Sequence, residues 1–206
     1  MGEQLTAVDG AAAVVARGGL VVVPTETVYG IAGRPDPDVV DRIFEVKHRP
    51  PEKSVQLLVP GAEWLDAVAH PSSDARLLAV AFWPGPLTLV TWARDDAPPA
   101  VVASTGAGRT IGVRVPAHPL ALELLARCGP LVASSANRSG EPTPPTVDGV
   151  RGVFGDEVDA YLDGGPAPGS GSTVVDVTNE RASLLREGPV TADMLRSVLG
   201  GRFEGV

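Results

Sequence analysis

The chain has 206 residues, of which 44% are hydrophobic and 20% charged, a composition typical of a globular protein with room for one substantial core. Its 17 basic and 25 acidic residues give a formal net charge of −8, which argues against a broad surface for nucleic acid or anionic membranes. Aromatic residues (4%) are too few for a base-stacking platform, and the single cysteine, Cys128, cannot form an internal disulfide. With no run of about 18 apolar residues, we expect a cytoplasmic protein without a membrane span.

The first half of the chain alternates helix-like and strand-like segments. Thr6 can cap a first helix, and Asp36-Pro37 has the cap and first-turn residues of a second one, which ends before Pro50-Pro51. On this second helix, Lys47 shares a face with the apolar residues Val40 and Ile43. The predicted helices are residues 6–17, 36–47, 62–69 and 74–82, and the predicted strands are residues 20–23, 55–59 and 87–92.

The second half repeats this pattern. The predicted strands are residues 110–115, 131–134, 158–162, 173–177 and 183–186, and the predicted helices are residues 118–127, 146–154 and 191–199. Residues 164–171 are rich in Gly, Pro and Ser, but similar strands flank them, so they indicate a flexible loop rather than a domain linker. The sequence therefore predicts a single α/β domain over residues 1–206, with a twisted, mixed β-sheet flanked by helices.

Polar side chains gather where the predicted strands give way to loops. They are Thr25, Thr27, Arg114, Ser135, Asn137 and Ser172. Because the ends of strands in an open α/β sheet border a shared crevice, a small polar ligand is expected there. Arg114 lies between two valines in a predicted strand, so its side chain either binds an anion or lies on a solvated face of the sheet. Its position in the strand favours neither alternative. Ser135 and Asn137 could by themselves simply cap turns.

Both lysines of the chain stand close together, at Lys47 and Lys53, with Arg49 between them. Arginine supplies the other 15 fixed positive charges, so two lysines in one segment suggest a need for compact, strongly hydrated point charges. Phosphate is the ligand that fits such charges. The alternative is a solvated helix end, and the polar turn at residues 24–30 favours the phosphate interpretation.

Several common catalytic patterns are missing from the sequence. It contains neither a G-x-x-x-x-G-K-[ST] phosphate loop nor a G-x-S-x-G nucleophile turn. Its three histidines show no metal-ligand spacing, and Cys128 lies in an apolar helix where a core position is more usual than a nucleophile. We therefore expect no protein metal ligands and a site that holds and neutralises its ligands.

Six motifs together resemble the YrdC-like threonylcarbamoyl-AMP synthases, also called L-threonylcarbamoyladenylate synthases. The motifs are PTETVYG at residues 24–30, KHR at 47–49, FWPGPLT at 82–88, VRVP at 113–116, SAN at 135–137 and STVVD at 172–176. They occur in the order of that family and cover the chain from about residue 20 to residue 188. One alone would be weak, but six in order are specific.

The resemblance implies a twisted α/β fold around a concave, positively charged cavity, in a single-domain form of the family. It implies a nucleotidyltransferase that joins L-threonine, bicarbonate and ATP into threonylcarbamoyl-AMP and releases pyrophosphate. ATP would be a substrate, and Mg²⁺ would share the negative charge of the leaving pyrophosphate. A separate transferase complex would then move the threonylcarbamoyl group to the adenosine beside the anticodon of certain tRNAs.

The resemblance also assigns roles to residues. The threonine pocket is expected to contain Thr27, Arg114, Ser135 and Ser172. The nucleotide is expected to contact Lys47, Arg49, Lys53, Thr110, Asn137, Thr143 and Arg186. Lys47 and Arg49 are the expected catalytic charges, since an anionic carbamate must approach a polyanionic nucleotide. Residues 164–171 could serve as a lid that shields the carbamate from water.

Two alternatives stay open. One is a carbamoyl-adenylate-forming domain of a hydrogenase-maturation enzyme, although such proteins carry zinc-finger-like and acylphosphatase-like segments for which this chain lacks the length and the cysteines. The other is a double-stranded RNA-binding module that uses the same basic concavity. The charge of −8 disfavours tight duplex binding, so weak RNA binding is all that we would expect.

Overall fold

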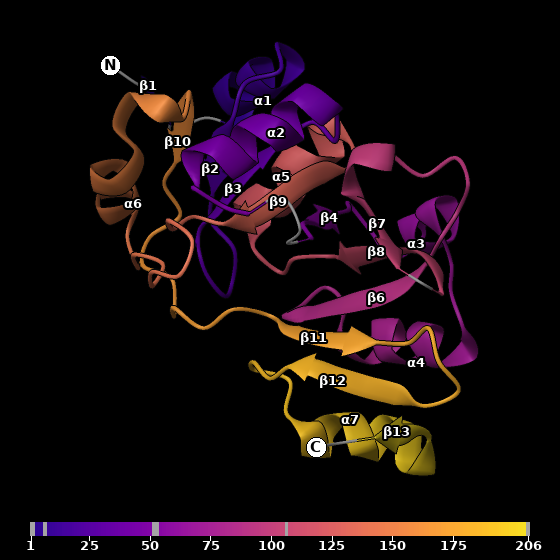
Figure 1. Cartoon of the computed structure of the whole chain (residues 1–206). Helices are drawn as coiled ribbons and strands as arrows, with labels where there is room; N and C mark the ends of the chain where they lie inside the picture. The colour runs from indigo at the N-terminus through magenta and orange to yellow at the C-terminus, as the bar shows by residue number, and fades with distance from the viewer. Residues whose placement is uncertain (1–2, 6–7, 51–53, 106, 205–206) are drawn as a thin grey trace.

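The computed structural model describes residues 3–5, 8–50, 54–105 and 107–204. Their strands form one mixed sheet in the order β1-β10-β2-β3-β9-β4-β8-β6-β11-β12-β13, with β5 paired to β6 and β7 paired to β8. Figure 1 shows the sheet running from β1 to the strands beside α7, so the two described chain ends lie at opposite edges. The strands are β1 Glu3–Leu5, β2 Val21–Val23, β3 Gly30–Gly33, β4 Gln56–Leu58, β5 Ala69–His70, β6 Leu87–Ala93, β7 Val102–Thr105, β8 Gly108–Arg114, β9 Leu131–Ser135, β10 Ala160–Leu162, β11 Thr173–Asp176, β12 Ala182–Arg186 and β13 Phe203–Glu204.

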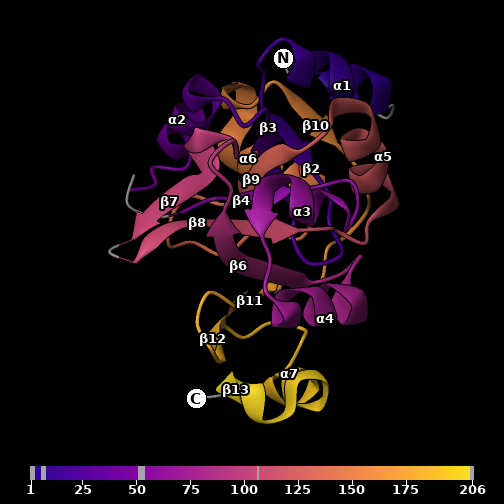
Figure 2. The same cartoon turned by 90° about the vertical axis from the view of Figure 1, so that its right-hand side faces the viewer.

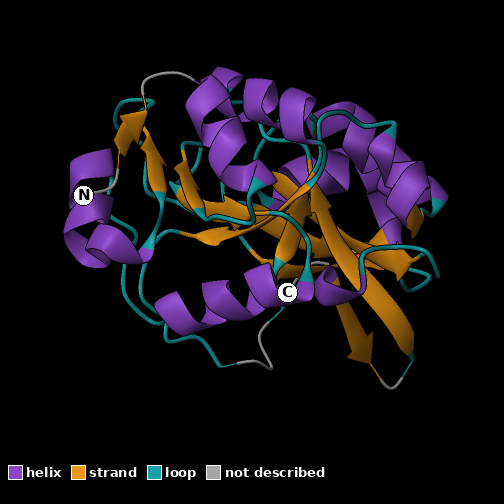
Figure 3. Cartoon of the chain, turned by 90° about the horizontal axis from the view of Figure 1, so that it is seen from above, coloured by secondary structure: helices purple, strands orange, loops and turns teal. Residues whose placement is uncertain are grey.

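Helices lie along both sides of the strands (Figure 3). They are α1 Val8–Ala16, α2 Pro37–Val46, α3 Trp64–Val68, α4 Ser73–Phe82, α5 Pro119–Cys128, α6 Val147–Phe154 and α7 Ala192–Leu199, with 3-10 turns at η1 Pro99–Val101, η2 Gly155–Glu157 and η3 Gly200–Arg202. At the C-terminal edge, α7 packs near β12 and β13 beside α4 (Figure 2). Within the described part of the chain, no helix is both long and apolar enough to cross a membrane.

Two hydrophobic clusters cover the two faces of the sheet. Alternation along β2 sends Val22 into the larger cluster and Val21 and Val23 into the smaller one, which α1 and α5 cover. In β8 the residues Ile111 and Val113 likewise enter the larger cluster. The intervening residues of β8 therefore face the other way, and this leaves a face of the central sheet available for a site.

The predicted fold class, a twisted mixed α/β sheet flanked by helices, is confirmed. Several boundaries were wrong: the strand expected at residues 131–134 extends to Ser135, and the one expected at residues 158–162 begins at Ala160. The proposed cap Thr6 lies outside the described residues. Cys128 ends α5, where it packs against the smaller cluster as expected for a structural cysteine, and burial raises the pKa of its thiol.

Five strands of the described chain were not predicted: the central β3, the edge strand β7, and the short strands β1, β5 and β13. β3 was missed because its sequence, GIAG, begins and ends with glycine, which usually weakens a strand. Gly33 is needed for close packing, since a Cβ there would lie 2.6 Å from Cγ1 of Val39. β7 was missed because it is short and half-exposed at the edge of β8.

Candidate functional site

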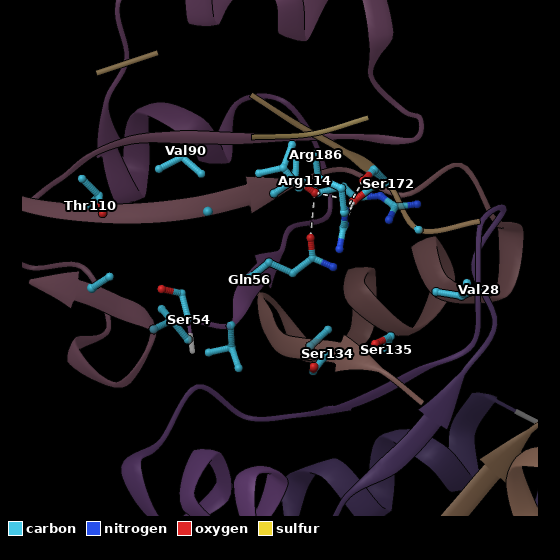
Figure 4. A pocket seen from close by; sticks show the side chains of 18 of the residues that line it. Val28, Ser54, Gln56, Val90, Thr110, Arg114, Ser134, Ser135, Ser172 and Arg186 are labelled. Atoms are coloured by element: carbon cyan, nitrogen blue, oxygen red, sulfur yellow. Dashed lines mark hydrogen bonds between the residues drawn. The ribbon is translucent and has the colours of Figure 1, made fainter. Parts of the chain in front are cut away.

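The candidate site is a pocket of about 220 Å³ over the face formed by β4, β6, β8, β9 and β11. Register explains its lining: Gln56 of β4 pairs with Gly112 of β8, and Thr88 of β6 pairs with Val174 of β11. Figure 4 shows side chains from these separate strands pointing toward one space. Six of the predicted site residues line it: Arg49, Thr110, Arg114, Ser135, Ser172 and Arg186.

Arg114 is 2% exposed at the end of β8, so the alternative of a solvated sheet face was wrong. Its Nη2 donates to Oγ1 of Thr27 at 3.0 Å and its Nε donates to the carbonyl oxygen of Gly85 at 3.2 Å. Nη2 also lies 2.8 Å from Oε1 of Glu26, an ion-pair contact without hydrogen-bond geometry. Burial lowers the pKa of Arg114, and the carboxylate of Glu26 opposes that shift.

The turn after β2 fixes Thr27 against Arg114. Oγ1 of Thr25 donates to the carbonyl of Val28 at 2.6 Å, so the 2.9 Å contact between the two threonine hydroxyls must be donated by Thr27. The hydroxyl proton of Thr27 is thereby used, and its oxygen accepts from Arg114. Thr27 is fully buried behind the pocket, where it positions Arg114. Sequence reasoning missed Glu26 as the acidic partner, although it stands between the two threonines.

Lys47 does not line the pocket. It caps the end of α2 with 1% exposure, and its Nζ donates to the backbone carbonyls of Ser135 and Asn137. The expectation of a strongly hydrated charge was therefore wrong: the apolar face of α2 carries Lys47 inward, and the loop after β9 receives its amine. Burial lowers the pKa of Lys47 to about 7, with a further contribution from the charge of Arg49.

Arg49 and Arg186 bring two further guanidinium groups to the pocket. Arg186 donates from Nε to the carbonyl of Ser172 at 2.9 Å, and Arg49 donates from Nη2 to the carbonyl of Ser54 at 2.7 Å. The Nε of Arg49 is buried and has no acceptor among the residues that the structure describes. Burial lowers the pKa of both groups, and the charge of Arg186 lowers that of Arg49 further. The charge of Arg186 also lowers the pKa of Arg114, so this group of guanidiniums is suited to an anionic ligand.

The remaining nucleotide candidates lie in the loop after β9 or outside the described chain. Nδ2 of Asn137 donates to the carbonyls of Arg138 and Glu141, both at 2.7 Å, and its Oδ1 accepts from Thr143 at 3.1 Å. Asn137 and Thr143 thus close a turn beside the pocket, as the turn-capping alternative described. Lys53 lies outside the described residues.

Gln56 and Thr88 line the pocket although the sequence analysis gave neither of them a role. The Oγ1 of Thr88 donates to Oε1 of Gln56 at 2.8 Å in the floor of the pocket. Both interrupt otherwise apolar strands, and that interruption is the pattern that could have identified them. For metals, no group of three or more His, Cys, Asp or Glu residues that could hold an ion occurs in the described segments.

Fold and site together define an open α/β protein with a pocket on its sheet face that three arginines line. The family model Sua5/YciO/YrdC, described as "Telomere recombination", matches residues 13–188. The chain belongs to this family.

Among its relatives, the putative threonylcarbamoyl-AMP synthase of Mycobacterium tuberculosis (strain H37Rv) is 41% identical over 186 residues, covering 89% of this chain and 84% of the relative. The threonylcarbamoyl-AMP synthase of Bacillus subtilis (strain 168) is 36% identical over 92% of this chain and 56% of the relative. The crystal structure of Pyrococcus abyssi Sua5 complexed with L-threonine matches with a TM-score of 0.89 and 36% identity, over 97% of this chain and 58% of that one. The chain thus spans little more than half the length of these last two proteins.

Proposed function

We propose that this protein is an L-threonylcarbamoyladenylate synthase, which makes threonylcarbamoyl-AMP and pyrophosphate from L-threonine, bicarbonate and ATP. The observation that carries the proposal is the convergence of Arg49, Arg114 and Arg186 on one pocket. The relatives named threonylcarbamoyl-AMP synthase support the same reaction. We further propose that residues 1–206 act as one domain in the cytoplasm and pass their product to a separate tRNA-modifying transferase complex.

The reaction needs no nucleophile from the protein. The amine of threonine attacks carbon dioxide and loses a proton, or attacks bicarbonate with release of water, to give a carbamate, and a carbamate oxygen then attacks the α-phosphorus of ATP. The new P–O bond forms as the bond to pyrophosphate breaks, and the electron pair leaves with pyrophosphate. Two unit charges about 4 Å apart interact by ~4 kcal/mol at an effective dielectric near 20, so the repulsion between the two anionic reactants is large. The pocket must offset it and hold the reactants in line.

The proposed roles follow from position in the site. Arg114 binds the carboxylate or carbamate of threonine, because its planar guanidinium can donate two parallel hydrogen bonds to a planar anion. Arg49 and Arg186 face the phosphates. Lys47 acts indirectly by holding the backbone beside Ser135, which lines the pocket. The remaining proposed contacts are Ser135 and Ser172 for threonine, and Lys53, Thr110, Asn137 and Thr143 for the nucleotide, while Thr27 serves the threonine pocket by positioning Arg114.

A pyrophosphate-release assay tests the proposal. With ATP, Mg²⁺ and bicarbonate, threonine should support release, and mass spectrometry should identify threonylcarbamoyl-AMP. Serine should support slower release, since the methyl group that it lacks contributes about 1–3 kcal/mol in a fitted pocket. Release that is equal with and without an amino acid would contradict the proposal. Tight duplex RNA binding at low salt without any release would favour the RNA-binding alternative.

We also propose that residues 164–171 cover the bound reactants. The loop is held near the site, because Gly169 donates its backbone N–H to the carbonyl of Thr27 at 2.9 Å and Tyr29 donates its hydroxyl to the carbonyl of Gly165 at 2.7 Å. Its last residue, Gly171, lines the pocket.

Limited proteolysis in this loop should slow when ATP and threonine are both present, because a closed loop resists cleavage. Cleavage elsewhere in the chain provides the internal control. Identical cleavage rates in the loop with and without the ligands would remove the lid role.

A further inference from the structure

A chain of side-chain hydrogen bonds crosses the floor of the pocket from β12 to β4. Nη2 of Arg186 donates to Oγ of Ser172 at 3.2 Å, and the hydroxyls of Ser172 and Thr88 lie 2.8 Å apart. Thr88 then donates to Oε1 of Gln56, also at 2.8 Å. Figure 4 shows Gln56 at the centre of the pocket with Ser172 and Arg186 beyond it. The strands β4, β6 and β12 and the residue that precedes β11 are thus linked through a single polar chain.

The direction of each bond in this chain is fixed by its ends. A guanidinium can only donate and an amide oxygen can only accept. Thr88 has one hydroxyl proton, which goes to Gln56, so Ser172 must donate the bond between the two hydroxyls. Both hydroxyl protons are therefore used within the protein. Ser172 can offer a ligand only an acceptor, and the end of the chain that can donate is the amide nitrogen of Gln56.

The amide of Gln56 stands clear of its neighbours. Its partners in register are Gly112 on β8 and Ala133 on β9, which have little or no side chain. Within the described segments, the only hydrogen bond of its side chain is the one that Oε1 accepts from Thr88, which leaves Nε2 without a protein acceptor. Gln56, Thr88 and Arg114 line the same pocket. Two N–H donors are thus held facing the space that the anion must occupy.

Given the proposed function, we infer that the amide of Gln56 donates a hydrogen bond to a carboxylate-type oxygen of the amino-acid substrate, and that Thr88 holds the amide in this orientation. The oxygen belongs either to the threonine carboxylate or to the carbamate formed from its amine. A neutral donor suits this position, because it stabilises an anion without adding a fourth positive charge to the three arginines. The role is one of substrate binding for Gln56 and of positioning for Thr88.

The variants Gln56→Glu and Gln56→Met separate donation from packing. Glu keeps the size of Gln and the oxygen that accepts from Thr88, but it replaces the donor with a second oxygen. We expect Gln56→Glu to raise the KM for threonine or bicarbonate by about 10- to 100-fold, since hydrogen bonds to charged groups are strong, and Gln56→Met to raise it less. If Gln56 only packs against Thr88, Gln56→Met will keep the wild-type KM, which overturns the inference; Gln56→Glu does not decide this alone, because its carboxylate repels the substrate anion whether or not the amide of Gln56 donates.

Two readouts identify the oxygen. Weaker threonine binding to Gln56→Met by calorimetry, without ATP or bicarbonate, assigns the threonine carboxylate. A raised KM for bicarbonate with unchanged threonine binding assigns the carbamate. If neither changes, the inference is wrong. The wild-type protein separates this result from the proposed function: if it releases no pyrophosphate in the presence of threonine, the proposed function fails, whereas calorimetry still tests the Gln56 contact.

The positioning role of Thr88 is tested by Thr88→Val, which should raise the same KM with little change in kcat, and by Thr88→Ser, which should restore the wild-type value. Thr91→Val is the matched control, because Thr91 lies on the same strand, is fully buried and has an unpartnered hydroxyl among the described residues. Equal activity of Thr88→Val and Thr91→Val would overturn the positioning role. Equal melting temperatures would show that no variant acts by unfolding.

Discussion

Replacing Arg114 with alanine should reduce kcat/KM for threonine by about 100-fold or more, in line with the cost of removing one partner of a buried charged contact. The change has two effects. It removes the guanidinium that would bind the substrate anion, and it leaves the carboxylate of Glu26 unpaired where that anion must sit. Pyrophosphate release at varied threonine concentration measures the loss, and calorimetry separates weaker binding from slower chemistry.

The double variant Arg114→Ala, Glu26→Gln distinguishes these effects. Removing the charge of Glu26 should recover part of the threonine affinity, because the repulsive carboxylate is gone, but not the part supplied by the guanidinium. Arg114→Lys is the matched control. It keeps the positive charge but loses the planar guanidinium, so we expect a threonine affinity between those of the wild type and Arg114→Ala. Wild-type threonine affinity in the double variant would show that Arg114 does not bind the substrate.

Replacing Lys47 with methionine should change how the free energy of unfolding depends on pH. The folded pKa of Lys47 is about 7, below its ordinary value of 10.5, because the charged form is buried. Between these two values the unfolded chain binds more protons than the folded chain, so this residue makes the wild type more stable as pH rises from 7. Each pKa unit corresponds to ~1.4 kcal/mol, so the wild type should gain on the order of 2 kcal/mol relative to Lys47→Met between pH 7 and pH 9.

Urea denaturation of both proteins at pH 6, 7, 8 and 9 provides the measurement. If the difference in the free energy of unfolding between wild type and Lys47→Met is the same at every pH, Lys47 does not titrate as a buried lysine.

In Lys47→Met, and also in Lys47→Ala, we expect most adenylate formation to be lost with the fold retained, because the carbonyls of Ser135 and Asn137 lose their donor. Full activity in Lys47→Ala would remove any role for this residue in catalysis.

The sequence predicted the elements of the fold better than it predicted the directions of side chains. Helix caps and apolar runs located the seven helices of the described chain, but the glycine-bounded β3 could be identified only from its partners on either side. The family resemblance assigned Arg49, Arg114 and Arg186 to the site, and in the structure all three line one pocket. It could not show that Lys47 points into the protein, although its position on the apolar face of α2 was the relevant clue.

The sequence could not predict the roles of side chains whose contacts come from several different strands. Gln56 and Thr88 come from strands 32 positions apart in the chain, and only the register of β4, β8 and β6 brings them together. Glu26 was likewise visible as an acidic residue in a turn, but its pairing with Arg114 depends on a contact across 88 positions. Local patterns carry no information about such long-range pairs.

The place of β10 in the sheet has a consequence for biosynthesis. This strand, Ala160–Leu162, sits between β1 and β2, with Ala160 opposite both Glu3 and Val21. The ribosome must therefore synthesise the chain as far as residue 160 before β2 can gain its second neighbour. Until then the nascent chain has an open strand edge, so we expect slow maturation and a need for protection against aggregation during translation.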